Sequence, residues 1–195
     1  MQNCDKIILD LCAGTGAWSE EYRKAGYNVH LITTPGTDVR YYNPPPNVYG
    51  ILAAPPCTQF SYARTTAKAP RDFIAGLEIV YSCKRIVDQA YLWHWRNGTI
   101  KNFHFWALEN PDGYLVRFLG KPAMTFHPYQ FGDPWRKKTC LWGIFNPPKE
   151  TPVEPTMKDF INRPELFIKH HRKDRAAVRA KTPPGFARAF YEANR

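Results

Sequence analysis

Residues 49–61, Y-G-I-L-A-A-P-P-C-T-Q-F-S, combine a short apolar run with two prolines and a cysteine. The apolar run is typical of a strand that is buried on both faces. Pro55 and Pro56 end this strand, because proline donates no hydrogen bond to a ladder and has a fixed φ. Cys57 is therefore expected on a stiff turn directly after a strand, where it is either a nucleophile or an ordinary loop cysteine.

A second strand and turn lie at residues 6–26. The run K-I-I-L-D-L predicts a buried strand, C-A-G-T-G a tight turn, and S-E-E-Y-R-K-A a helix that ends at Gly26. This order is typical of the opening of a Rossmann-like α/β sheet, in which glycines let the backbone approach a ligand beside a helix N-terminus. Ser19 stands where a dinucleotide site has its third glycine, so an NAD-type site is disfavoured. The alternative is that the glycines serve only the turn.

The remaining hydrophobic patterns predict a mostly parallel sheet that ends in a β-hairpin with a basic tip. Apolar residues at helical spacing predict a crossover helix and a final helix. The predicted strands are 28–33, 103–108, 124–131 and 139–145, and the predicted helices are 72–95 and 186–193.

Glu109 directly follows the predicted strand over residues 103–108. Ligands bind outside the carboxyl ends of the strands in open α/β sheets, so Glu109 and Cys57 are expected to face the same crevice. The alternative is that Glu109 only caps a following helix.

Composition limits the kind of partner. The 195 residues suit one domain, and the net charge of +10 suits a polyanionic partner or simple solubility. The polar loop over residues 62–71 carries three cations that contact phosphates or belong to a solvated loop. Five scattered cysteines without a C-x-x-C pair favour a reducing, intracellular setting and disfavour a metal site. No apolar run reaches membrane-spanning length, so no membrane partner is expected.

Taken in order, five segments of the chain resemble the cytosine-C5 DNA methyltransferases: D-L-C-A-G-T-G, A-P-P-C-T-Q-F-S, L-E-N-P, G-D-P-W-R-K-K and T-P-P-G-F-A-R-A-F. The likeness covers most of the chain and thins over residues 146–181. The pairing of P-P-C with E-N is specific, whereas the glycine motif alone is not. The resemblance implies a single domain over residues 1–195 with the class I S-adenosylmethionine-dependent methyltransferase fold. It implies DNA as partner, base flipping, and the cytoplasm of a bacterial or phage-infected cell.

The resemblance also implies roles for individual residues. Cys57 would be the nucleophile and Glu109 the acid beside it, with Arg136 or Lys137 assisting. The residues implied in binding S-adenosylmethionine are Asp10, Cys12, Ala13, Gly14, Gly16, Trp18, Asp38, Val39 and Pro55. The residues implied in binding the nucleic acid are Ser61, Arg64, Lys68, Arg71 and Lys138.

The chain departs from the family pattern in several places. Cys12 stands where the family usually has Phe, and no acid ends the strand over residues 28–33 to bind the cofactor ribose. The family's Q-x-R-x-R motif is reduced to W-R-K-K-T, and T-P-P-G replaces G-N-x-V-x-P. Residues 146–181 form a short basic segment in place of a large target-recognition domain. The alternatives to a DNA methyltransferase are therefore an RNA methyltransferase and a nucleic-acid-binding protein without catalysis.

Overall fold

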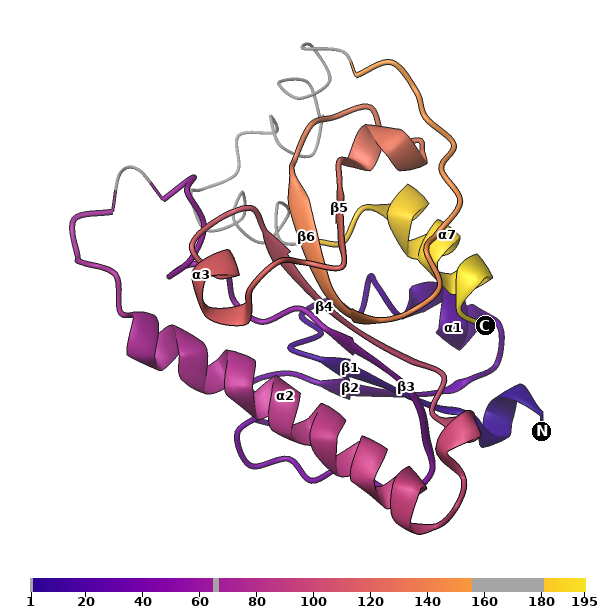
Figure 1. The fold of residues 1–195 in the computed structure, drawn as a ribbon. Helices are drawn as coiled ribbons and strands as arrows, with labels where there is room; N and C mark the ends of the chain where they lie inside the picture. Colours follow the sequence, from indigo (N-terminus) through magenta and orange to yellow (C-terminus); the bar gives the residue numbers. More distant parts are fainter. Residues whose placement is uncertain (1, 65–66, 156–180) are drawn as a thin grey trace.

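The computed structural model describes residues 2–64, 67–155 and 181–195, and shows an α/β protein built on a six-stranded mixed sheet (Figure 1). The strand order is β2-β1-β3-β4-β6-β5. The strands are β1 (Ile7–Leu11), β2 (Asn28–Ile32), β3 (Val48–Ala53), β4 (Phe105–Pro111), β5 (Met124–Phe126) and β6 (Thr139–Ile144). Most of the short basic segment predicted over residues 146–181 lies outside the described residues.

Four strands form the parallel part of the sheet. Leu11 of β1 pairs with Ile32 of β2 and with Ala53 of β3, and Ala53 pairs with Leu108 of β4. All four carboxyl ends therefore lie at one edge of the sheet. The chain passes from β1 to β2 on one side and returns to β3 on the other side. This reversal creates a switch point between β1 and β3, where open α/β sheets bind ligands.

The other two strands are antiparallel to this part. The register of β6 opposite β4 pairs Glu109 with Leu141 and Pro111 with Thr139. Strand β5 then pairs with β6 as the predicted hairpin. Because β6 provides hydrogen-bond partners, β4 continues through Glu109 to Pro111, beyond the predicted end at Leu108. Glu109 is therefore part of a strand. The alternative, that Glu109 only caps a following helix, is wrong.

The first strand of the hairpin is shorter than predicted. The sequence predicts a strand over residues 124–131, but β5 ends at Phe126 and the 3-10 helix η3 (Pro128–Phe131) follows. Pro128 cannot donate to a ladder but fits the first position of a helix. Gly132 ends η3 in the left-handed conformation, with φ 90.

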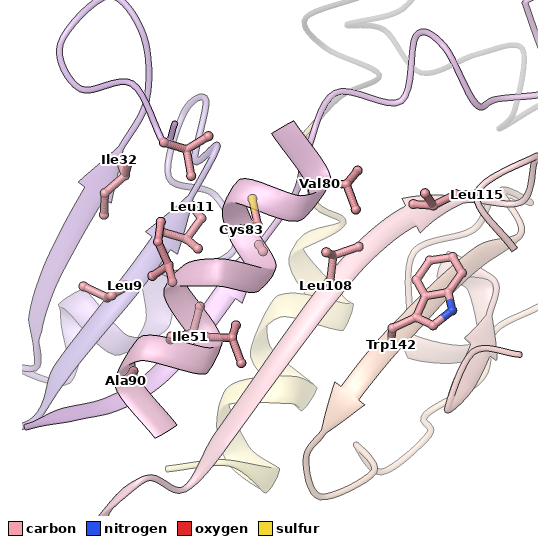
Figure 2. Packing of buried hydrophobic residues seen from close by; sticks show 14 of the residues in the cluster. Leu9, Leu11, Ile32, Ile51, Val80, Cys83, Ala90, Leu108, Leu115 and Trp142 are labelled. Atoms are coloured by element: carbon pink, nitrogen blue, oxygen red, sulfur yellow. The ribbon is translucent and has the colours of Figure 1, made fainter. Parts of the chain in front are cut away.

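Helices cover both faces of the sheet (Figure 1). On one face α2 packs on a cluster that includes Leu9, Ile51 and Leu108, which lie beneath the helix in Figure 2. On the other face α1 and α7 bury Trp18 and Phe186 in a second cluster. The helices are η1 (Asn3–Asp5), α1 (Glu20–Lys24), α2 (Phe73–Arg96), η2 (Ile100–Asn102), α3 (Val116–Leu119) and α7 (Pro184–Ala193).

Candidate active site

Three segments meet at the edge that holds the carboxyl ends of the parallel strands. The glycine turn, residues 12–16, follows β1, and the cysteine turn, residues 54–61, follows β3. The third segment, residues 109–114, is the end of β4 and the loop after it. The first two flank the switch point between β1 and β3.

The glycine turn presents open backbone. Cys12, Gly14 and Gly16 have φ values of 59, 56 and 70, and the Gly16 amide donates to the Ala13 carbonyl over 2.8 Å. Gly14 is exposed, and a Cβ built on it meets no atom within 4 Å. The space above Gly14 is therefore accessible to a ligand. Cys12 is half-buried beside α2, with its Sγ 4.0 Å from that of Cys83.

Asp10 supports the glycine turn from inside the protein. Its side chain is 1% exposed, and Ser19 Oγ donates to Asp10 Oδ2 over 2.6 Å. Burial raises the pKa of the Asp10 carboxyl to about 7, against a smaller opposing effect of the hydrogen bond from Ser19. Ser19 thus ties the start of α1 to β1, a role that the sequence reading missed although it noted Ser19 as a departure from the dinucleotide pattern.

Three other residues implied in cofactor binding are already engaged within the protein. Trp18 is 2% exposed and packs edge-on against Phe190, with ring centroids 5.5 Å apart. The Asp38 carboxylate pairs with Arg40 over 2.6 Å, and this hydrogen-bonded guanidinium lowers the pKa of Asp38. Val39 is 5% exposed and packs in the cluster beneath α2. Of the residues implied in cofactor binding, Gly14 in the glycine turn is the one with open space above its backbone.

The cysteine turn is tight and begins in the sheet. The Ala54 amide donates to the Leu11 carbonyl over 2.9 Å, which fixes the chain just before the two prolines. The Cys57 carbonyl then accepts hydrogen bonds from the amides of Phe60 (2.9 Å) and Ser61 (2.8 Å). Cys57 is half-buried in this turn.

Asn110 joins the cysteine turn to β4. Its Nδ2 donates to the Pro55 carbonyl over 2.9 Å, and the residue is fully buried. Asn110 follows Glu109 in β4. The same strand therefore positions Glu109 and holds Pro55, two residues before Cys57. The sequence reading used the E-N pair only as a motif and did not assign a role to Asn110.

A second set of contacts holds the other end of the cysteine turn. Ser61 forms a bridge with Gly113, and the Tyr114 amide donates to the Phe60 carbonyl over 2.8 Å. A Cβ on Gly113 would lie 2.3 Å from the Phe60 carbonyl oxygen, so only glycine allows this approach. The cysteine turn is therefore bonded to the third segment on both sides of Cys57.

Glu109 is a largely buried carboxyl group. Its side chain is 15% exposed, and burial raises its pKa above the ordinary value. Lys137 Nζ lies 3.9 Å from Glu109 Oε1 and opposes this shift with a smaller effect. The structure thus brings together Glu109 and Lys137, two of the four residues implied in catalysis.

The other cations differ in how they are used. Arg136 is exposed and lies over the Tyr129 ring, 5.7 Å from its centroid. Lys138 pairs with Asp112 over 3.3 Å. Lys68 is exposed in the loop before α2.

Two arginines expected at phosphates instead bind the protein backbone. Arg64 donates to the Ala69 carbonyl over 3.0 Å. Arg71 donates to the carbonyls of Gln59 and Ser61, each over 2.9 Å. Both arginines therefore hold together the described part of the polar loop over residues 62–71.

Comparison of the chain with protein-family models and with curated proteins gave no match in either case. Within residues 2–64, 67–155 and 181–195, no cluster of three His, Cys, Asp or Glu side chains could hold a metal ion. None of the helices in these ranges is long and apolar enough to cross a membrane.

Proposed function

We propose that this protein transfers a methyl group from S-adenosylmethionine to C5 of cytosine in DNA, through a covalent bond between Cys57 and C6. The observation that carries the proposal is the pair of contacts on either side of Cys57. The bond from Asn110 to Pro55 and the bridge from Ser61 to Gly113 hold the turn that carries Cys57 against β4 and the loop after it, and β4 bears a carboxyl with a raised pKa.

The proposed reaction explains the need for a thiol. Cytosine C5 is a poor nucleophile because its electrons belong to an aromatic ring. Addition of the Cys57 thiolate to C6 removes the aromaticity of the ring and makes C5 an enamine-like carbon. C5 attacks the methyl carbon of the sulfonium, and S-adenosylhomocysteine leaves. Water then removes the proton at C5, and the electron pair re-forms the C5=C6 double bond as the thiolate leaves C6.

Glu109 and Lys137 support the charge that develops on the pyrimidine. Electron density moves toward N3 and O2 when the thiolate adds to C6. A protonated Glu109 donates to N3, and its raised pKa keeps the proton available. Lys137, 3.9 Å from this carboxyl, supplies positive charge on the same side.

The open glycine turn is the proposed site of the cofactor. Its position at the switch point of the sheet supports a class I methyltransferase fold, because ligands of open α/β sheets bind there. The accessible backbone at Gly14 allows close contact with S-adenosylmethionine. Asp10, Trp18 and Val39 are buried and offer no open surface to the cofactor.

DNA is the proposed substrate because the chain carries a net charge of +10. A target base in a duplex must rotate out of the stack to reach Cys57 and Glu109. Exposed Lys68 and Arg136 are available to hold phosphates and so to offset the cost of unstacking.

The test is adduct formation with DNA that contains 5-fluorocytosine, in the presence of S-adenosylmethionine. Fluorine at C5 blocks the final elimination, so the protein is expected to form a complex that survives denaturation. Cys57→Ala should form none, whereas Cys4→Ala, which removes an exposed thiol in η1, should react like the original protein. Failure of the original protein to form the adduct or to make 5-methylcytosine in DNA would contradict the proposal. Methylation of RNA alone would transfer the same chemistry to RNA.

A further inference from the structure

Arg71 lies at the centre of the contacts around the cysteine turn. Its two terminal nitrogens donate to two carbonyls of that turn, Nη1 to Gln59 and Nη2 to Ser61, each over 2.9 Å. A planar guanidinium holds two acceptors in a fixed relation, which a lysine ammonium cannot do. The side chain therefore sets the distance between two carbonyls that lie two and four positions after Cys57.

The same guanidinium also contacts the third segment of the site. It lies over the ring of Tyr114, 5.0 Å from the centroid, and the Tyr114 amide donates to the Phe60 carbonyl. Arg71 thus spans the cysteine turn and the loop after β4, on the side of Cys57 opposite the bond from Asn110 to Pro55.

The neighbouring residues connect this contact to α2. Asp72, next to Arg71, caps α2 by accepting from the Ala75 amide over 2.9 Å. The Asp72 amide donates to Gln59 Oε1 over 2.9 Å. The start of a 24-residue helix therefore fixes the backbone from which the Arg71 side chain extends.

We infer that Arg71 is a positioning residue that fixes the backbone of the Cys57 turn through its two hydrogen bonds, and that it is not a contact to phosphate. The inference rests on the proposed function for the role of Cys57, but the contacts themselves do not. Two backbone carbonyls and an aromatic ring already occupy the guanidinium. A phosphate would have to compete with these partners.

Arg71→Lys separates the two roles. A lysine retains the positive charge that attracts phosphate but loses the two-pronged bond to the carbonyls. A positioning role predicts at least a tenfold lower rate of adduct formation with 5-fluorocytosine DNA at saturating DNA and cofactor. It also predicts an unchanged salt dependence and less than a twofold change in DNA affinity. A phosphate contact predicts that Arg71→Lys behaves like the original protein, whereas Arg71→Gln binds DNA more weakly and with a lower salt slope.

Arg117 provides the matched control. It lies over the same Tyr114 ring, 5.3 Å from the centroid, and is exposed. Arg117→Lys makes the same chemical change beside the same ring and should leave the rate of adduct formation within twofold. A tenfold loss in this control would assign the effect to the ring contact and would overturn the inference.

Hydrogen exchange tests the inference independently of catalysis. The amides of Phe60, Ser61 and Tyr114 donate hydrogen bonds to carbonyls of the cysteine turn. In Arg71→Lys, these amide hydrogens should exchange with solvent at least tenfold faster. If the original protein forms no adduct, the proposed function fails, and unchanged exchange in Arg71→Lys would separately overturn the positioning contacts. If the original protein does form the adduct, two further results for Arg71→Lys would overturn the inference. One is faster exchange with an unchanged rate of adduct formation, and the other is a lower rate of adduct formation with unchanged exchange. Arg71→Gln should show the same faster exchange, which keeps the test available if one variant does not fold.

Discussion

At the scale of single residues, the site depends on two carboxyl groups in different surroundings. Glu109 lies near a cation, 3.9 Å from Lys137 Nζ, and keeps a 15% exposed side chain. Asp10 is 1% exposed and accepts from a neutral hydroxyl, that of Ser19. Burial raises both pKa values, but of these two side chains Glu109 is the more exposed.

Glu109→Gln should reduce the rate of methyl transfer by about 10²–10⁴-fold, the usual contribution of a general acid. The raised pKa keeps the Glu109 proton at higher pH, and the rate component that needs this proton is lost as the pH rises through that pKa. The glutamine variant should lack this pH-dependent component. Rates measured across pH for both proteins test the prediction. Glu192→Gln, at an exposed position of α7, serves as the control and should retain the original profile.

Asp10→Asn should flatten the dependence of stability on pH. The carboxyl has a pKa of about 7 in the folded protein and an ordinary pKa of 3.8, so the folded state holds the proton more tightly. Its stabilising contribution is fully present below pH 3.8 and decreases as the pH rises to 7, by about 4 kcal/mol in total. Urea unfolding at several pH values measures this. An equal decrease in Asp10→Asn would show that other groups cause it.

At the scale of elements, β4 connects the chemistry to the fold. It pairs with β3 in parallel and with β6 in antiparallel register, and it carries both Glu109 and Asn110. Hydrophobic runs and breakers predicted β1 to β4, α2 and α7 well, because most of these elements bury several apolar residues each. The end of β4 and the shortness of β5 were not predictable, since both depend on the register with β6 and on η3.

The candidate site divides in the same way. Cys57 and Glu109 stood out because a breaker or a strand end marks each of them in the sequence. Ser19, Asn110 and Arg71 act through contacts with residues 9 to 55 positions away, and no local pattern records such contacts. Asp10 and Trp18 were expected at the cofactor surface, but their burial depends on how α1 and α7 pack on the sheet.

Gly113→Ala should destabilise the protein by about 1–3 kcal/mol, the usual effect of an overpacked site. The new Cβ would lie 2.3 Å from the Phe60 carbonyl oxygen, which is backbone and cannot rotate away. Gly36→Ala is the matched control, because its Cβ would meet its nearest atom at 3.5 Å. Chemical denaturation of the two variants tests the prediction. Equal stabilities would mean that the cysteine turn is not held close to Gly113.

At the scale of the whole molecule, α7 closes the face of the sheet that lies opposite α2 (Figure 1). Phe186 is fully buried and stacks on Phe126 of β5, with ring centroids 4.0 Å apart. Asp133 Oδ2 accepts from the Gly185 amide over 2.9 Å, which joins the first turn of α7 to the loop before β6. The last helix thus supports the hairpin that carries Lys137.

Phe186→Ala should cost about 3–5 kcal/mol of unfolding free energy, the usual loss for a buried Phe. Since small domains have a net stability of only about 5–15 kcal/mol, the melting temperature should fall by several degrees or more. Ile74 of α2 is 85% exposed, so Ile74→Ala should change the free energy of unfolding by less than about 0.5 kcal/mol, the usual limit for a surface substitution. Calorimetry of both variants tests this difference. A loss below 1 kcal/mol for Phe186→Ala, about the size of a minor core change, would show that α7 is not needed to close the core.

The pairing of β4 with β6 has a mechanical consequence. Lys137 and Lys138 immediately precede β6. A force exerted on these two ammonium groups is therefore transmitted to the hydrogen bonds between β6 and β4, the strand that carries Glu109. Cys57 lies in the turn after β3, which Asn110 of β4 holds through the Pro55 carbonyl. Strand β4 is therefore bonded both to the strand that follows the two lysines and to the turn that carries Cys57.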